Sequence, residues 1–205
     1  MKVELHLHTD RYSACSVASP DEMMDALVSL GYEAVYLTEH DALWPEREVA
    51  ELRAAHPRIR IFPGVELTVT ADPVEHLLVL GTSDPEYLEI DDAAELLEKA
   101  RAAGDLTILA HPFRFDVGAA MVRRQHLLPD ALEYCSCNQP PALGEYARRL
   151  AAESALALVN AGDCHALDFL GRYWIETERD LCGPRDIRDV VLRGEYENKA
   201  TKWGG

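Results

Sequence analysis

Short apolar runs alternate along the chain with longer stretches in which apolar residues recur every three or four positions. The short runs have the length of single strands, and the periodic stretches have the spacing of amphipathic helices. The runs predict strands at residues 2–8, 34–38, 59–66, 76–80, 106–110, 131–135 and 155–160, with one more at 173–177. The periodic stretches predict helices at residues 19–31, 44–55, 91–103, 117–127, 142–152 and 184–193.

The first of these helices carries clear start and stop signals. Ser19 at the N-cap, Pro20 at the first helical position and Glu22 three residues after the cap form a capping box. Met24 belongs to the apolar stripe, and Gly31 ends the helix. The other strands and helices are predicted from the same kinds of signal, apolar periodicity and the residues that start or stop an element.

Strand–helix alternation favours a parallel sheet with right-handed crossovers. The link at residues 69–75 is short, which predicts a hairpin-like departure between the strands at 59–66 and 76–80. Polar candidate ligands come from at least six strands, and only a closed or nearly closed ring brings six strand ends together. We therefore expect a single-domain α/β barrel of about seven strands over residues 1–194, followed by a polar, loosely held tail at residues 195–205.

Two similar tripeptides near opposite ends of the chain carry pairs of metal-ligand side chains. His6-Leu7-His8 closes the first apolar run, and Asp163-Cys164-His165 closes a late one. Side chains two apart on a strand point the same way, so each tripeptide presents two ligands on one side. Four further candidates stand at or near the ends of other apolar runs: His40, Glu66, His76 and His111.

Each candidate alone has an ordinary explanation, such as a polar turn or a satisfied core histidine. Together, six imidazoles and two carboxylates are too many for one tetrahedral zinc, which takes four ligands. They suit two or three ions that share Glu66 as a bridge, and imidazole-rich ligation favours zinc, iron or manganese over calcium or magnesium. Asp41, directly after His40, suits the carboxylate that orients a ligating histidine. The pattern indicates hydrolysis by a metal-bound hydroxide, with no separate protein nucleophile.

Two arginines follow the ligand segments closely and are candidates for substrate binding. Arg114 comes just after His111, and Arg172 lies a few residues after His165. Planar guanidinium groups suit phosphate oxygens, although a surface salt bridge explains each arginine equally well. Arg11 is a weaker third candidate.

The formal net charge of −16 argues against broad electrostatic binding to DNA or RNA, which makes a nucleic-acid polymer an unfavoured partner. No apolar run is long enough to span a bilayer, and residues 1–4 enter a strand without a signal-peptide pattern, so we expect a cytoplasmic protein. The five cysteines form no C-x-x-C pair, and a disulfide framework is not expected. Cys135 and Cys137 share one side of a strand and are interpreted as core residues in a reducing compartment, with contact to the site as the alternative.

The ordered set of motifs resembles the polymerase-and-histidinol-phosphatase (PHP) superfamily over nearly the whole chain. The motifs are His6-x-His8, Thr38-Glu39-His40-Asp41, Gly64-Val65-Glu66, His76, Ala110-His111-Pro112 and Asp163-x-His165. The resemblance implies a distorted (β/α)7 TIM-like barrel, a trinuclear metal centre and phosphoesterase activity.

The resemblance also implies how the ligands are shared. It assigns His6, His8, Glu66 and Asp163 to a first ion, Glu66, His76 and His111 to a second, and His40 and His165 to a third. The family often has Ser-Asp-Gly in the first loop, where that Asp completes the third ion's shell. This chain has Ser13-Ala14-Cys15-Ser16, which leaves three replacements open: Asp10, Cys15 or water. A dinuclear centre is the alternative.

These observations favour a metal-dependent phosphoesterase that hydrolyses a small phosphorylated metabolite or nucleotide. A nuclease of the same family is the nearest alternative. A non-catalytic, metal-binding regulatory domain, decayed at Ala14, is another. Carbon–nitrogen hydrolysis on an amidohydrolase-like barrel is less favoured, because such barrels usually need a longer chain and because the zinc deaminase signature is absent.

Overall fold

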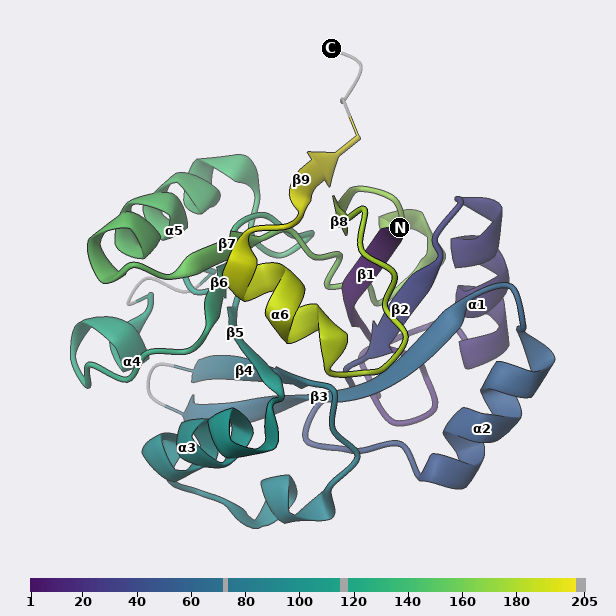
Figure 1. Ribbon diagram of the computed structural model, residues 1–205, viewed down its shortest axis with the longest axis horizontal. Helices are drawn as coiled ribbons and strands as arrows, with labels where there is room; N and C mark the ends of the chain where they lie inside the picture. Colours follow the sequence, from purple (N-terminus) through teal and green to yellow (C-terminus); the bar gives the residue numbers. More distant parts are fainter. Residues whose placement is uncertain (72–73, 115–117, 202–205) are drawn as a thin grey trace.

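One nine-stranded sheet runs through the computed structural model, which describes residues 1–71, 74–114 and 118–201. The strand order is β7-β6-β5-β4-β3-β2-β1-β8-β9, and the sheet curls into a nearly closed barrel (Figure 1). The strands are β1 (Lys2–Leu7), β2 (Ala34–Leu37), β3 (Arg60–Ala71), β4 (Val74–Leu80), β5 (Leu106–Ala110), β6 (Ala131–Glu133), β7 (Ala157–Val159), β8 (Tyr173–Glu176) and β9 (Glu197–Ala200). The expected barrel of about seven strands is confirmed in β1–β7, which β8 and β9 extend.

Helices cover the outside of the barrel in two groups (Figure 1). Beside β1–β3 lie α1 (Pro20–Ser29) and α2 (Glu46–Ala55). Beside β4–β7 lie α3 (Ala93–Ala103), α4 (Ala120–Arg123) and α5 (Pro141–Ser154). Two 3-10 turns, η1 (Pro85–Glu89) and η2 (Leu167–Phe169), complete the connections. The capping box of α1 is present, with the Ser19 hydroxyl accepting from Glu22 N.

The barrel interior is apolar over most of its depth. Inward-facing side chains such as Leu5, Tyr36 and Ile108 form one buried cluster. The helix α6 (Asp186–Arg193) closes the end at which the parallel strands begin, and it adds Ile187 and Val190 to the same cluster. Because this end is filled, inward-facing polar side chains have room to meet only at the opposite end, where the parallel strands finish; we call this end the rim.

The hairpin-like departure expected between the third and fourth strands is confirmed. β4 runs antiparallel to both β3 and β5, whereas β1, β2 and β3 pair in parallel, as do β5, β6 and β7. β3 does not end at Glu66, as the sequence suggested, but continues to Ala71 because it pairs with the start of β4. The hairpin therefore projects beyond the rim.

The seam between β1 and β7 is closed by isolated contacts rather than by a continuous ladder. Near the rim, a parallel bridge joins Leu7 to Cys164, and His8 N donates to Cys164 O at 3.0 Å. Deeper in the seam, the buried Glu4 carboxylate accepts from Gly162 N at 2.6 Å. At the other end, β8 pairs antiparallel to β1 and widens the sheet across the gap.

β9 reaches β7 through side chains. The Asn198 amide oxygen accepts from Asn160 N at 2.6 Å, and its nitrogen donates to Leu158 O at 2.9 Å. The Tyr196 hydroxyl donates to Leu158 O at 2.6 Å. The expectation of a loosely held tail from residue 195 is therefore wrong for residues 197–200, because ladder bonds to β8 fix this polar segment. Residues 202–205 lie outside the described part of the chain.

The expected helix at residues 117–127 is much shorter in the structure, where only Ala120–Arg123 is helical. Its first residue, Val117, lies outside the described residues. The strand at 173–177 is confirmed as β8, which ends at Glu176.

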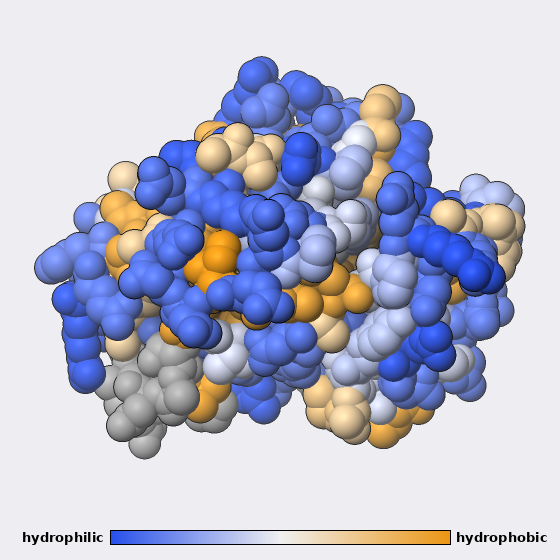
Figure 2. Space-filling model, turned by 90° about the horizontal axis from the view of Figure 1, so that it is seen from below, coloured by the Kyte–Doolittle hydropathy of each residue, from blue (hydrophilic) through white to orange (hydrophobic). Residues whose placement is uncertain are grey.

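Figure 2 shows the face that lies below in Figure 1, where hydrophilic side chains predominate and hydrophobic ones form small separate patches.

Replacing Asn198 by alanine should destabilise the seam. The substitution removes both bonds between the Asn198 amide and the end of β7, and we expect a loss of about 1–3 kcal/mol in the free energy of unfolding. Chemical denaturation measures the free energy of unfolding, and a chelator in the buffer keeps metal binding from contributing to it. Glu197→Ala, at an exposed neighbouring position of β9, is the control, and an equal loss in both variants would show that the amide bonds are not responsible.

Candidate metal centre

The eight candidate ligands identified in the sequence converge at the rim. His6 lies on β1, Glu66 on β3 and His76 at the start of β4. The other five follow the ends of β1, β2, β5 and β7 within a few residues: His8, His40, His111, Asp163 and His165. Because β4 runs in the opposite direction, its first residues reach the same rim that the parallel strands reach with their last.

Glu66 stands at the centre of the group, and its side chain is fully buried. Five imidazole nitrogens surround its two carboxylate oxygens. The Oε2 atom lies 3.1 Å from His6 Nε2, 3.1 Å from His8 Nε2 and 3.0 Å from His40 Nδ1. The Oε1 atom lies 2.9 Å from His76 Nδ1 and 3.1 Å from His111 Nε2. Each oxygen therefore faces a different set of histidines, as a carboxylate shared by two ions requires.

Asp163 is the second buried carboxylate of the rim. Its Oδ1 atom lies 3.6 Å from His6 Nε2, 3.6 Å from His8 Nε2 and 3.4 Å from His165 Nδ1. Its Oδ2 atom accepts from the Asn138 amide at 2.6 Å. Asn138 thus fixes one oxygen and leaves the other directed at the histidines.

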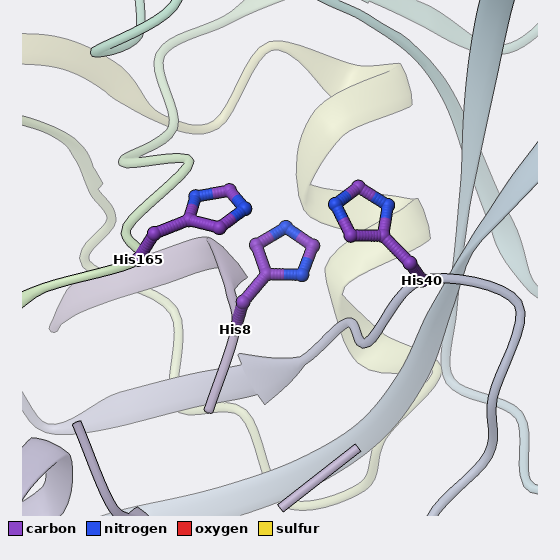
Figure 3. Close-up of side chains that lie close together, drawn as sticks. All are labelled: His8, His40 and His165. Carbon is purple, nitrogen blue, oxygen red and sulfur yellow. The ribbon is translucent and has the colours of Figure 1, made fainter. Parts of the chain in front are cut away.

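The described residues contain three sets of candidate ligand atoms. Within each set, all the atoms lie within 4.8 Å of one another, a spacing that a single ion can bridge. The inner group is His6, His8 and Asp163, all buried. The outer group is His8, His40 and His165, of which the last two are partly exposed. A third set consists of His40, Glu66 and His76. Figure 3 shows the outer group, with His8 between the other two rings and a nitrogen of each ring turned toward their common space.

The charges of the rim are strongly coupled. Burial opposes the charge of Glu66, but His6, His111 and His76 outweigh it and hold the pKa of Glu66 well below its ordinary value. Burial lowers the pKa of His40 and of His165 to about 4. The two outer histidines are therefore neutral at pH 7, which is the form that binds metal.

The donor atoms fit divalent cations. Among the described residues, the buried atoms His8 Nε2 and Asp163 Oδ1 have no hydrogen-bond partner. His8 Nε2 lies 3.1 Å from Glu66 Oε2 but is not aligned for a hydrogen bond. Buried polar atoms are normally satisfied. A cation between imidazole and carboxylate atoms of this kind would satisfy them together, and this donor set suits zinc, iron or manganese.

Two of the candidate ligands adopt left-handed backbone conformations. His111 has φ of 28° and Asp163 has φ of 50°, which is rare for residues other than glycine. The Glu133 carboxylate accepts a bond from His111 N, and Asn138 holds the Asp163 side chain. The surrounding polar contacts thus maintain both strained positions.

Sequence reasoning missed several residues that hold the ligands. Glu133, at the end of β6 and fully buried, lies 3.5 Å from His6 Nδ1 through Oε1. Its position, a carboxylate at the end of an apolar run, is the signal that identified Glu66, and it was available in the sequence. Ser13 Oγ lies 3.2 Å from His8 Nδ1. Ser13 was named only as the start of the loop in which the family often has Ser-Asp-Gly, and nothing in the sequence marked Asn138, which also comes from a loop.

Asp41 does not orient His40, as the sequence suggested. Its carboxylate accepts from the amide and the hydroxyl of Thr68 at 2.7 and 2.8 Å. The Nδ1 atom of His40 faces Glu66 instead. Asp41 therefore joins the end of β2 to the extended part of β3.

The three candidate arginines differ in their surroundings. Arg114 is exposed and lies in the turn that follows His111, with its amide donating to His111 O at 3.0 Å. Arg172 donates to Asp168 O at 3.0 Å and lies over the Phe169 ring. Arg11 pairs with Glu48 on α2.

The two cysteines near β6 differ in their surroundings. Cys135 is buried in the core, and burial raises the pKa of its thiol to about 12. The Cys137 thiol lies 3.6 Å from Phe169 O.

Among the helices of the described residues, none is long and apolar enough to cross a membrane.

Comparison with known proteins connects this rim to a family. A model described as the PHP domain matches residues 4–125, more than half of the chain. The error-prone DNA polymerase of Cutibacterium acnes is 33% identical in an alignment 122 residues long, which covers 52% of this chain and 11% of the polymerase.

Solved structures share the fold over almost the whole chain. A two-domain protein from Bacteroides vulgatus, containing a predicted PHP-like metal-dependent phosphoesterase, gives a TM-score of 0.74 at 18% identity over 98% of this chain and 64% of that chain. An amidohydrolase from Chromobacterium violaceum gives a TM-score of 0.69 at 16% identity over 96% of this chain and 98% of that chain.

Six of the eight candidate ligands fall inside the matched region 4–125, and the remaining two, Asp163 and His165, meet them in space. The fold, the order of the motifs and their convergence agree with the family model. The chain belongs to the PHP domain family.

Proposed function

We propose that the protein is a metal-dependent phosphoesterase that hydrolyses a small phosphorylated metabolite or nucleotide. The observation that carries the proposal is the position of Glu66, a fully buried carboxylate with five imidazole nitrogens within 3.1 Å of its two oxygens. Such a concentration of ligand atoms is costly to bury without cations. Membership of the PHP family supports the same chemistry.

In this proposal the eight ligands hold two or three divalent ions. His6, His8, Glu66 and Asp163 would bind the first ion, Glu66, His76 and His111 the second, and His40 and His165 the third. When bound, the ions lower the pKa of a water molecule and neutralise phosphate oxygens, which is the chemistry that phosphoester hydrolysis requires.

The side chains of the rim differ in their access to solvent, and this difference gives substrate a direction of approach. His6 and His8 are fully buried, whereas the side chains of His40, His76 and His165 are 29%, 13% and 15% exposed. A phosphate group therefore reaches the site from the side of the three exposed histidines. Arg114, exposed in the turn after His111, is the candidate to bind its outer oxygens.

A substrate screen tests the proposal and separates its alternatives. Turnover of p-nitrophenyl phosphate or nucleoside monophosphates, stimulated by Mn²⁺ or Zn²⁺ and abolished by chelator, is the expected result. Preferential cleavage of single-stranded DNA would indicate a nuclease, which the relationship to a DNA polymerase keeps as the second candidate. Hydrolysis of cyclic amides alone would indicate carbon–nitrogen chemistry. Metal binding without turnover of any ester or amide would indicate a regulatory domain.

Replacing Glu66 by glutamine should abolish phosphoesterase activity and lower the metal content together. One carboxylate serves two ions, and the amide loses the charge while keeping the size. Mass spectrometry of bound metals and phosphate-release assays measure both effects. Asp105→Asn, at a buried carboxylate paired with Tyr87 and Arg185, is the control and should keep its metal. A Glu66→Gln protein with unchanged metal stoichiometry would rule out the bridging role.

Replacing Glu133 by glutamine should weaken metal binding at the inner group by about 10- to 100-fold. Glu133 faces His6 Nδ1, and carboxylates in this position fix the orientation and basicity of a ligating imidazole. Competition with a chromogenic chelator measures the affinity. An unchanged affinity would show that the contact with His6 is only structural.

Replacing Arg114 by alanine should raise KM for phosphate esters by roughly tenfold or more and leave kcat nearly unchanged, because a charge-assisted hydrogen bond contributes about 1.5–3 kcal/mol. Steady-state kinetics measure both constants. Arg149→Ala, at an exposed position of α5, is the matched control. Equal KM values for the wild type and the Arg114 variant would remove this arginine from the substrate site.

A further inference from the structure

The turn from His111 to Arg114 is anchored by the loop that follows β6. His111 N donates to the Glu133 carboxylate, and Phe113 N donates to Gln139 Oε1 at 2.8 Å. The proline between His111 and Phe113 has no N–H, and Arg114 N donates within the turn to His111 O at 3.0 Å. Both N–H groups that point out of the turn are therefore held by side chains of one neighbouring segment, which begins at Glu133 and ends at Gln139.

The Gln139 side chain matches its surroundings in the number and kind of hydrogen bonds. It is fully buried, and its Nε2 atom donates to Glu133 O at 2.6 Å and to Tyr134 O at 3.2 Å. A glutamine amide offers two donors and one acceptor oxygen, and here it meets two carbonyl oxygens and the N–H of Phe113. Because a buried amide must be bonded, these partners fix its orientation and leave the oxygen directed at Phe113.

The loop that carries Gln139 is itself fixed on both sides. Ser136 N donates to Gln139 O at 3.0 Å, and Gln139 N donates to Ser136 Oγ at 3.1 Å, so the loop is closed by its own bonds. The neighbouring Asn138 amide donates to Asp163 Oδ2 at 2.6 Å, which joins the loop to the segment after β7. Gln139 is thus a fixed point against which the turn after β5 is held.

We propose that Gln139 is a positioning residue, which holds Arg114 in place for substrate binding through its bond to Phe113. The proposal rests on the proposed function and on the role of Arg114 in it. His111 is held separately by Glu133, so loss of the Gln139 bond should release Phe113 and Arg114 but leave the histidine in place. Substrate affinity therefore depends on a fully buried amide in the supporting loop.

Replacing Gln139 by methionine keeps the length of the side chain and removes its amide. The KM for p-nitrophenyl phosphate should rise by about 2- to 10-fold, the factor that one neutral hydrogen bond contributes, while kcat and metal content stay nearly unchanged. Because the effect runs through Arg114, adding Gln139→Met to Arg114→Ala should raise KM no further. Gln125→Met, at an exposed position after α4, is the matched control and should keep the wild-type KM.

Replacing Gln139 by glutamate separates the bond to Phe113 from the stability of the loop. One carboxylate oxygen still accepts from Phe113 N, whereas the other meets the carbonyl oxygens of Glu133 and Tyr134. Gln139→Glu should therefore unfold at lower denaturant concentration than Gln139→Met and yet keep a KM near the wild-type value. A KM as high as that of Gln139→Met would show that the bond to Phe113 is not responsible.

Hydrogen exchange followed by NMR, with Zn²⁺ in the buffer, tests the contact itself. The Phe113 amide should be protected in the wild type and lose this protection in Gln139→Met. Rapid exchange of the Phe113 amide in the wild type would overturn the proposal without any variant. Equal KM values in the wild type and Gln139→Met would overturn it, as would a rise in KM that adds fully to that of Arg114→Ala. Loss of bound metal in Gln139→Met would show that the effect runs through His111 instead, and would overturn it too.

These experiments separate the proposal from the one on which it rests. If the wild type hydrolyses phosphate esters and Gln139→Met has the same KM, only the role of Gln139 is wrong. If the wild type hydrolyses no phosphate ester, the proposed function is wrong and the role of Gln139 in substrate binding is wrong with it.

Discussion

The burial of negative charge at Glu66 is the constraint on which the rest of the rim depends. A carboxylate removed from water costs several kcal/mol unless opposite charges and hydrogen bonds compensate it. Here five imidazole nitrogens lie within 3.1 Å of the carboxylate oxygens, and three of these five side chains are themselves buried. The carboxylate and the histidines can therefore be buried only as a group. The loops at the rim, the seam between β1 and β7 and the carboxylate of Asp163 all help to hold this group together.

The barrel achieves the assembly by separating apolar and polar layers within one ring of strands. Away from the rim, the inward side chains form a continuous hydrophobic cluster, and α6 closes the end of the barrel opposite the rim. The candidate ligands lie where each strand reaches the rim or in the loop directly after it, including His76 at the start of the antiparallel β4. Because the first and last ligand segments, around His8 and Asp163, meet across the seam, the site requires both ends of the ring to be joined.

Much of the fold and the convergence of the eight candidate ligands at the rim could be predicted from the sequence, for a physical reason. Strand ends combine apolar periodicity with an abrupt change to His, Asp or Glu, and both signals are local. The seam was not predictable in this way, because Asn198 and Glu4 act on residues that are distant in the sequence. Loop side chains such as Ser13 and Asn138 carry no periodic signal. Glu133 was detectable, because it ends an apolar run as Glu66 does.

The left-handed backbone at His111 and Asp163 has a consequence for stability. Each such position costs on the order of 1–3 kcal/mol, and glycine would adopt the same conformation without this cost. Glycine would also remove an imidazole or a carboxylate from the rim. Local backbone stability and the donor set of the rim therefore make opposite demands on these two positions.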